Sequence, residues 1–412
     1  MDPILNPFAP GAGSRPPELA GREDILDEAR IAIERTTAGR PSRGMLLLGL
    51  RGVGKTVLLN EIQRMATESG ENVCLFLEAP EGRSLAEMLV PALRKALLQL
   101  SKKERAEARA KKAIAALRNF ASVFKVKIGE VQIGVEPDPG TADSGDLDSD
   151  LTDLFIGVAE TASQVGSGVV LIMDELQYLD STELSALIVA LHRIEQRNLP
   201  VIFFGAGLPQ IAALAGDAKS YAERLFNYPI VGPLDRDAAR DAIGYPLYRE
   251  GVAIEQRALD FIIERTQGYP YFLQEWGSHV WDVAIESPIS EEDVRLADEG
   301  AVAQLDRSFF RVRFDRLTPR EQDYLRAMAE LGPGPHGSGD IAGVLGQPAS
   351  AVATLRQGLI EKGMIYSPRH GETAFTVPMF DQFLRRAMTS WTPPTPPPKR
   401  TTRGRPPRTT GG

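Results

Sequence analysis

Short apolar runs alternate with stretches of helical periodicity through the first half of the chain. The runs are rich in Val, Ile, Leu, Met and Phe, as in buried strands, and lie at residues 45–48, 73–77, 169–173, 200–205 and 229–231. Between them, apolar positions recur every three or four residues, as in helices, over residues 25–33, 57–65, 85–100 and 181–197. Continuous apolar strands separated by helices predict an α/β fold with a parallel sheet covered on both faces.

Residues 101–153 interrupt this alternation. Residues 102–112 form a charged run of helical character, and residues 124–135 alternate like a small hairpin that turns at Gly129. Residues 136–153 are acidic and rich in Gly, Pro and Ser, the composition of a disordered connector, and they lack the spacing of a Ca²⁺-binding loop. We therefore expect residues 101–153 to be an insertion that ends in an acidic linker.

The pattern becomes wholly helical after residue 233. Helical periodicity covers residues 236–249, 258–266 and 271–285, and a capping box at Ser290-Glu291-Glu292-Asp293 opens a further helix. We therefore expect an all-α domain over residues 234–316.

A different arrangement is expected from Leu317 onward. Thr318-Pro319-Arg320-Glu321 starts a helix that continues to Leu331, with Pro at its first position. Two more helices are expected at residues 339–345 and 350–362, followed by two short strands at 364–366 and 374–377. Three helices and a wing of paired strands are the outline of a winged-helix domain, here over residues 317–390.

Both ends of the chain lack a core-forming pattern. Residues 1–17 are rich in Pro, Gly and Ala and are expected to form a loose lead-in, and residues 391–412 to form a basic, Pro-rich disordered tail. The whole chain has a net charge of −8, and because the tail carries five basic residues and no acid, the rest carries −13. An acidic body repels nucleic acid, so any DNA binding must come from local basic surface.

Composition narrows the class of protein further. The 412 residues exceed one typical core, and an apolar content of 43% is that of an ordinary globular protein. No apolar run approaches the roughly 18 residues of a membrane span. A single cysteine, Cys74, forms no internal disulfide framework and suits a reducing compartment. We expect a cytoplasmic protein without a membrane segment.

A phosphate-binding motif lies between the strand expected at 45–48 and the helix expected at 57–65. It matches G-x-x-x-x-G-K-[ST] and consists of Gly49, Leu50, Arg51, Gly52, Val53, Gly54, Lys55 and Thr56. Val57 follows the motif and is counted with the site. Its glycines let backbone N–H groups close on phosphate oxygens, and the helix N-terminus adds partial positive charge. Lys55 is expected to reach the β- and γ-phosphates of ATP, and the Thr56 hydroxyl to bind Mg²⁺.

Two carboxylates follow the strand expected at 169–173. Asp174 and Glu175 come at its carboxyl end, which is the edge where α/β sheets bind ligands. In P-loop enzymes an acid at this point holds Mg²⁺, and a second carboxylate can act as general base toward the attacking water. We expect Asp174 to be the metal ligand and Glu175 the base.

These motifs resemble those of the AAA+ and STAND ATPases, in particular the branch related to origin-recognition initiators. The resemblance covers about residues 19–390, with Gly49 to Thr56 similar to Walker A and Leu171 to Glu175 similar to Walker B. It implies ATP and Mg²⁺ as cofactors, an AAA+ core over residues 18–233, an α-helical lid with its connector over 234–316, and the winged helix already outlined.

Four further segments carry the resemblance. Residues 19–23 are similar to the GRE box, which implies that Gly21 and Arg22 lie near the adenine, and residues 203–209 resemble the fourth-strand motif. Residues 267–273 resemble the lid motif, which implies that Pro270 packs near the base. Residues 221–226 look like the segment that carries the family's arginine, here Arg224. Arg224 is then either a trigger that reaches the γ-phosphate or a surface salt bridge, and the sequence leaves both open.

The end of the fourth strand departs from the AAA+ pattern. The family usually carries a polar sensor there, Asn or Thr, whereas this chain has Gly205, Ala206 and Gly207. Either another residue positions the water, with Gln177 and Gln210 as candidates, or hydrolysis is slow.

The resemblance supports several functions. The first is an ATPase that acts as a nucleotide-driven switch coupled to DNA or a partner through the winged helix, with a homo-oligomer as one arrangement. The second is a STAND-type signalling scaffold in which nucleotide gates assembly, and the third an accessory ATPase of transposition or defence. DNA contacts could come from Thr354, Arg356, Gln357, Lys362, Arg369 and His370, or from Arg403-Gly404-Arg405-Pro406, which resembles the core of an AT-hook. The third helix could instead pack or bind protein.

Overall fold

The computed structural model describes residues 1–11, 13–103, 106–126, 140–369 and 371–394. The chain divides into two compact units, Met1–Val302 and Ala303–Gly412. In the described part of the chain, no helix is both long enough and apolar enough to cross a membrane.

The first unit is built on a five-stranded sheet whose neighbouring strands are all parallel, which confirms the predicted α/β fold. In sheet order the strands are β2 (Val73–Glu78), β3 (Val169–Asp174), β4 (Val201–Gly207), β1 (Gly44–Leu48) and β5 (Phe226–Asn227). The strand expected at 229–231 is reduced to a single bridge between Ile230 and Leu48, because the paired segment lies a few residues earlier.

The register of the sheet brings the two predicted motifs to one edge. Leu48 at the end of β1 pairs with Gly207 of β4, and Met173 near the end of β3 pairs with Gly205 of the same strand. The P-loop that follows β1 and the carboxylates that follow β3 therefore emerge on either side of the end of β4. This is the carboxyl edge, where parallel sheets bind ligands.

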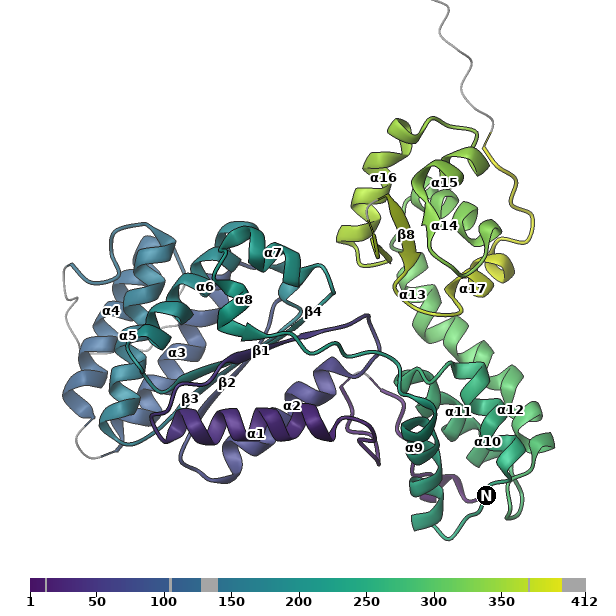
Figure 1. Ribbon diagram of the computed structural model, residues 1–412, viewed down its shortest axis with the longest axis horizontal. Helices are drawn as coiled ribbons and strands as arrows, with labels where there is room; N and C mark the ends of the chain where they lie inside the picture. Colours follow the sequence, from purple (N-terminus) through teal and green to yellow (C-terminus); the bar gives the residue numbers. More distant parts are fainter. Residues whose placement is uncertain (12, 104–105, 127–139, 370, 395–412) are drawn as a thin grey trace, which may run out of the picture. The chain divides into compact units, whose positions relative to one another are not determined.

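Helices cover both faces of the sheet (Figure 1). On one face lie α1 (Glu23–Thr37) and α2 (Lys55–Glu68), and on the other α6 (Ser181–Gln196) with the short α7 (Ile211–Ala218) and α8 (Ala222–Leu225). The strands β1 and β3 are buried along their whole length, which explains why their sequences are continuously apolar rather than alternating.

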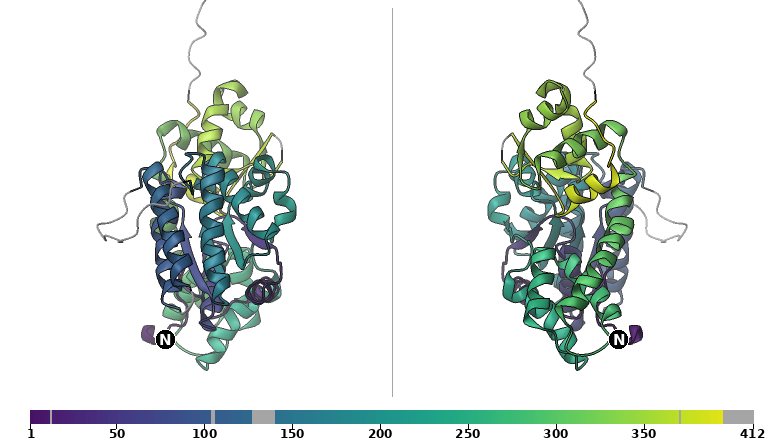
Figure 2. Two further views of the ribbon diagram at one scale, coloured as in Figure 1. Left: turned by 90° about the vertical axis from the view of Figure 1, so that its left-hand side faces the viewer. Right: turned by 90° about the vertical axis from the view of Figure 1, so that its right-hand side faces the viewer.

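The segment expected to be an insertion extends the helical layer of the sheet. Helix α3 (Leu85–Ser101) packs on α4 (Glu107–Val123), α4 on α5 (Leu147–Gln164), and α5 on α6. Figures 1 and 2 show α4 and α5 running alongside each other. The predicted hairpin falls mostly on residues 127–139, outside the described residues.

The prediction of a disordered connector over residues 136–153 is wrong from residue 147 onward, where α5 begins. Asp150 is 1% exposed, and its carboxylate accepts hydrogen bonds from the backbone N–H groups of Ser144 and Gly145 at 3.1 and 2.9 Å. Leu151 beside it is fully buried. The acidic residues therefore stabilise the turn from which α5 begins.

Four helices follow the sheet, as predicted. They are α9 (Arg236–Arg249), α10 (Gln256–Thr266), α11 (Pro270–Val283) and α12 (Glu291–Gln304). The first three pack on one another around fully buried Trp276 and Phe272. We refer to residues 234–302 as the lid.

The N-terminal residues are packed against the lid, so the prediction of a loose lead-in is wrong. They include the short helix η1 (Pro3–Leu5). The Asn6 side chain donates to the backbone oxygen of Ser278 and to Asp282, each at 3.1 Å. Phe8 is 5% exposed and lies against Gly277 of α11, where an added Cβ would come within 2.6 Å of its ring.

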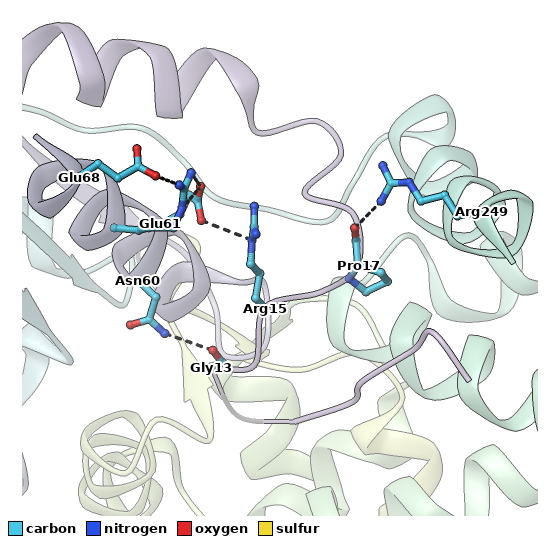
Figure 3. A network of polar contacts seen from close by, with 8 residues as sticks. Gly13, Arg15, Pro17, Asn60, Glu61, Glu68 and Arg249 are labelled. Atoms are coloured by element: carbon cyan, nitrogen blue, oxygen red, sulfur yellow. Dashed lines mark hydrogen bonds and ion pairs between the residues drawn. The ribbon is translucent and has the colours of Figure 1, made fainter. Parts of the chain in front are cut away.

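The same segment then reaches the P-loop helix α2 (Figure 3). Asn60 donates to the backbone oxygen of Gly13 at 3.2 Å, and Arg15 forms an ion pair with Glu61 at 3.4 Å. Arg249 of the lid donates to the backbone oxygen of Pro17 at 3.0 Å. We call residues 2–17 the N-terminal strap, because they connect α11 to α2.

The second unit joins helices to a three-stranded antiparallel sheet. Its elements are the π-helical turn η3 (Leu305–Phe310), α13 (Arg311–Phe314), α14 (Pro319–Leu331), β6 (His336–Gly337), α15 (Ser338–Val344), α16 (Ala349–Glu361), β7 (Ile365–Tyr366), β8 (Glu372–Phe375) and α17 (Phe380–Ala387). The three predicted helices and the strand pair β7–β8 are present, and β6 is an additional strand that pairs with β8. Helix α14 starts with Pro319 at its first position as predicted, and a capping box of Thr318 and Glu321 opens it.

Candidate functional site

The P-loop backbone is held close to the end of β4. The Gly49 N–H donates to the Gly207 carbonyl at 3.1 Å, and an added Cβ on Gly49 would come within 2.2 Å of the Val231 oxygen. Gly52 and Gly54 have φ values of +82° and +95°, which favour glycine. The loop therefore needs glycine at these positions for its shape, and this shape turns backbone N–H groups toward a phosphate.

Lys55 is the first residue of α2 and is 8% exposed. Its ammonium donates to the backbone oxygens of Gly49 and Leu50 at 2.9 and 2.8 Å, so it is folded over the loop. Burial lowers the pKa of the Lys55 ammonium, and the nearby carboxylates of Glu175 and Asp174 partly oppose this shift. A buried cation at a helix N-terminus that donates to neutral backbone oxygens is suited to receive an anion.

Thr56 and Asp174 meet across the sheet edge. The Thr56 hydroxyl donates to Asp174 Oδ2 at 2.6 Å, and the Glu175 N–H donates to Asp174 Oδ1 at 2.8 Å. Asp174 is 3% exposed, and burial raises the pKa of its carboxyl group. A hydroxyl and a carboxylate in contact provide two of the hard oxygen ligands that Mg²⁺ takes in proteins, so the donor set fits that ion.

Glu175 follows β3 with φ of 55° and ψ of 42°, in the left-handed region that a non-glycine residue rarely occupies. Strained backbone of this kind clusters at functional sites. Its carboxylate accepts a hydrogen bond from the Gln177 side-chain amide, and the Gln177 oxygen accepts one from the Leu208 N–H at 3.3 Å. Gln177 thus connects the carboxylate to the end of β4.

The end of β4 is closely packed where a polar sensor is missing. An added Cβ on Gly205 would come within 2.5 Å of the Leu176 side chain and 2.7 Å of the Leu46 side chain, so a larger residue there would require both to shift. At Gly207 the added atom would lie 3.2 Å from the Gln177 side-chain oxygen. Gln177 therefore stands where the sensor side chain is missing, whereas among the described residues no hydrogen bond joins the Gln210 side chain to the site.

Lid residues lie directly against the P-loop. The Tyr269 hydroxyl donates to the backbone oxygen of Arg51, and the Tyr271 N–H donates to the Gly52 oxygen at 3.3 Å. An added Cβ on Gly52 would come within 2.9 Å of the Tyr269 ring. Pro270, which the sequence predicts to pack near the base, is half-buried at the first turn of α11, next to Tyr269.

Arg22 is tied to the backbone near the same loop. Its guanidinium donates to the Gly232 oxygen and, at 3.5 Å, to the Val53 oxygen, and burial lowers its pKa. Gly21 has φ of +68°, and an added Cβ would come within 2.7 Å of Ala238 in the lid. The predicted GRE segment therefore lies between the core and the lid.

The remaining predicted residues are less closely tied to the site. Val53 is 1% exposed, and Leu50 and Val57 are half-buried around the loop. Arg224 lies on α8 and is exposed. Among the contacts of the described residues, none connects Arg224 to the P-loop or to Glu175.

Helix α16, the third of the three helices predicted after Leu317, uses its basic side chains internally. Arg356 donates to the Thr373 hydroxyl at 2.9 Å and to the Glu372 oxygen at 3.0 Å, both on β8. Lys362 forms an ion pair with Glu321 at 2.8 Å. Two of the residues expected to read bases thus hold α16 to its neighbours. His370 and the AT-hook-like segment lie outside the described residues.

Residues 18–204 match the family model described as AAA ATPase domain. The chain carries an AAA ATPase domain. Residues 307–384 match a second model, described as Domain of unknown function (DUF8462). No curated protein matches the chain in sequence.

Solved structures share the fold of the AAA domain, and the aligned part of this chain is longer than residues 18–204. The Walker-type ATPase paby2304 of Pyrococcus abyssi is 18% identical with a TM-score of 0.58, and the alignment covers 92% of this chain and 99% of that one. The ORC2 protein of Aeropyrum pernix, in its ADPNP-ADP complexes, is 15% identical with a TM-score of 0.53, covering 92% and 98%. At these identities the similarity concerns the fold alone.

Proposed function

We propose that the protein binds and hydrolyses Mg·ATP at the edge of its sheet and works as a nucleotide-driven switch. The observation that carries this proposal is the contact of Thr56 with Asp174 beside the buried Lys55. Lys55 and Thr56 open α2 after β1, Asp174 ends β3 on the other side of β4, and together they combine a cation with two oxygen ligands. An AAA ATPase domain over residues 18–204 agrees with this chemistry.

Each residue has a distinct role in the proposed reaction. Backbone N–H groups of the P-loop and the Lys55 ammonium bind the phosphates, and Thr56 and Asp174 hold Mg²⁺, which supplies positive charge at the transferring phosphoryl group. Glu175 accepts the proton of the attacking water as general base. Gln177 keeps the Glu175 carboxylate in place through its contact with β4, the task that a sensor side chain would otherwise share.

In this proposal, the contacts between the lid and the P-loop couple nucleotide binding to the position of the lid. Tyr269 and Tyr271 touch the P-loop through Arg51 and Gly52, and the N-terminal strap connects α11 to α2. Phosphates that bind in the loop must therefore act on groups that also hold the lid. We propose that nucleotide state sets the lid position and that α12, which continues from the lid into the second unit, transmits it.

A second candidate function follows from the second unit, which we interpret as a winged helix. Because Arg356 and Lys362 are engaged within the unit, α16 offers little positive charge to DNA. This observation favours a STAND-type scaffold, in which nucleotide gates assembly with a protein and turnover is slow. For the switch on DNA, the remaining basic surface would have to come from exposed residues such as Arg369 and from the tail.

Steady-state ATP turnover, measured with and without duplex DNA over a range of protein concentrations, tests these functions. Turnover that DNA stimulates supports the switch on DNA, and nucleotide that stays bound through purification with little turnover supports the scaffold. If Arg224 acts across a subunit interface, specific activity rises with concentration, and mixing Arg224→Ala with Glu175→Gln protein restores activity. No binding and no turnover of ATP would overturn both proposals.

A further inference from the structure

Arg51 is the third residue of the P-loop and has an unusual environment for a surface cation. Its side chain is half-buried, and its Nη2 donates to the Tyr178 hydroxyl at 2.8 Å. Its Nε is fully buried and has no hydrogen-bond partner in the described part of the chain. A buried donor without a partner costs free energy, so a ligand that accepts from this guanidinium would gain from it.

The contacts of Arg51 place its guanidinium on the catalytic side of the loop. Tyr178 ends the short helix η2 (Leu176–Tyr178), which begins directly after Glu175. The guanidinium is therefore bonded to the turn that follows the proposed base.

Two features of the site call for a further cation near the terminal phosphate. The end of β4 supplies no polar side chain, because its last three residues are Gly205, Ala206 and Gly207. The γ-phosphate brings negative charge that ADP lacks, and a planar guanidinium binds phosphate oxygens through two parallel hydrogen bonds. Arg51 can reach such a group by exchanging the neutral Tyr178 hydroxyl for a charged acceptor.

We propose that Arg51 contacts the terminal phosphate of the bound nucleotide and makes the site prefer a nucleoside triphosphate over the diphosphate. The inference rests on the proposed function, which it deepens, because it assigns this preference to one side chain of the P-loop. The backbone oxygen of Arg51 also accepts a hydrogen bond from the Tyr269 hydroxyl of the lid. In this proposal, the residue that contacts the terminal phosphate is therefore hydrogen-bonded to the lid, whose position depends on the nucleotide.

The test measures the affinities for ADP and for a non-hydrolysable ATP analogue, each with Mg²⁺, in wild type, Arg51→Met and Tyr178→Phe. Arg51→Met is expected to lose about 10- to 100-fold in affinity for the triphosphate, the usual worth of a charge-assisted contact, and no more than about threefold for ADP. Tyr178→Phe keeps the cation and should change neither affinity by more than about threefold. Arg51→Lys should recover part of the lost affinity.

Three outcomes would overturn the inference. Equal losses for both nucleotides in Arg51→Met would mean that Arg51 shapes the loop. A loss in Tyr178→Phe as large as in Arg51→Met would mean that the contact between the two side chains matters rather than the cation. Unchanged affinities in Arg51→Met would mean that Arg51 touches no phosphate. Failure of wild type to bind either nucleotide would instead contradict the proposed function itself.

Discussion

At the scale of single residues, Glu175 and Asp174 adjoin in sequence but have different surroundings. Asp174 is buried against Thr56, whereas Glu175 is half-buried and held by Gln177. Glu175→Gln should preserve ATP binding and reduce turnover by roughly 10²- to 10⁴-fold, because it removes a general base. Asp174→Asn should weaken the Mg²⁺ dependence of nucleotide affinity. Turnover by Glu175→Gln at the wild-type rate would contradict this division of roles.

Glu275 in the lid gives a pH prediction. It is 4% exposed, and burial raises the pKa of its carboxyl group, although the Tyr271 hydroxyl donates to it at 2.9 Å and His279 lies 3.8 Å away. A raised pKa stabilises the folded protein below the unfolded-state value of about 4.3, and this contribution is lost as pH rises through the raised value.

Glu275→Gln removes that titration and keeps an acceptor for Tyr271. Its melting temperature should therefore exceed that of wild type by an amount that grows from about pH 4 and then levels off above the raised pKa of Glu275. Melting curves of both proteins from about pH 4 to about pH 8 check this. A difference that stays constant across the range would show that Glu275 ionises as freely in the folded lid as in the unfolded chain.

Sequence spacing could predict the P-loop residues and the two carboxylates as candidates, because each motif is local and follows an apolar strand. It could not predict the contacts of Arg51, since Tyr178 lies 127 positions away. The absence of a polar sensor was visible in the letters Gly205-Ala206-Gly207. The packing of Leu176 and Leu46 on Gly205, in contrast, depends on tertiary structure.

At the scale of elements, the N-terminal strap shows how composition can mislead. Pro, Gly and Ala before residue 18 suggested a loose segment, yet Phe8 is buried against Gly277 of α11. Phe8→Ala should cost about 3 kcal/mol, the usual value for a large-to-small change at a buried aromatic residue. Amide hydrogen exchange in α11 should then accelerate, because the strap covers that helix.

Leu5→Ala is the matched control, since Leu5 belongs to the same strap but is 56% exposed. It should change stability by no more than about 0.5 kcal/mol. Equal effects of the two substitutions, or unchanged exchange in α11 of Phe8→Ala, would show that the strap does not stabilise the lid.

Helix α5 illustrates the same difficulty for acidic sequence. Asp146 caps the helix, Asp148 and Asp150 lie in its first turn, and carboxylates at a helix N-terminus are favourable. The composition of this segment indicated a disordered linker. The positions of its acidic residues, directly before the apolar face of Leu151, Leu154 and Phe155, could have predicted the helix.

At the scale of the whole molecule, the charge distribution governs any binding to DNA. The chain carries a net charge of −8, and its last 22 residues hold five basic residues and no acid. If each of the five neutralises a phosphate, the tail contributes roughly −4.5 to the slope of log affinity against log salt.

Deleting residues 392–412 should flatten that slope and reduce any preference for A·T-rich duplex, as fluorescence anisotropy at several salt concentrations would show. Arg356→Ala serves as the comparison, because it should destabilise the second unit and not selectively weaken binding to one sequence. If full-length protein binds no duplex even at low salt, the second unit is better interpreted as a surface for protein.

The central claim is that ATP binds with Mg²⁺ at the P-loop, and calorimetric titration of wild type and Lys55→Ala with Mg·ATP tests it most directly. Lys55 is buried and donates to backbone oxygens of the loop, so its replacement by Ala removes the cation that we propose to bind phosphate. Wild type should bind ATP, and Lys55→Ala, folded by circular dichroism, should lose about 10- to 100-fold or more in affinity. Equal affinities of the two folded proteins would contradict the account.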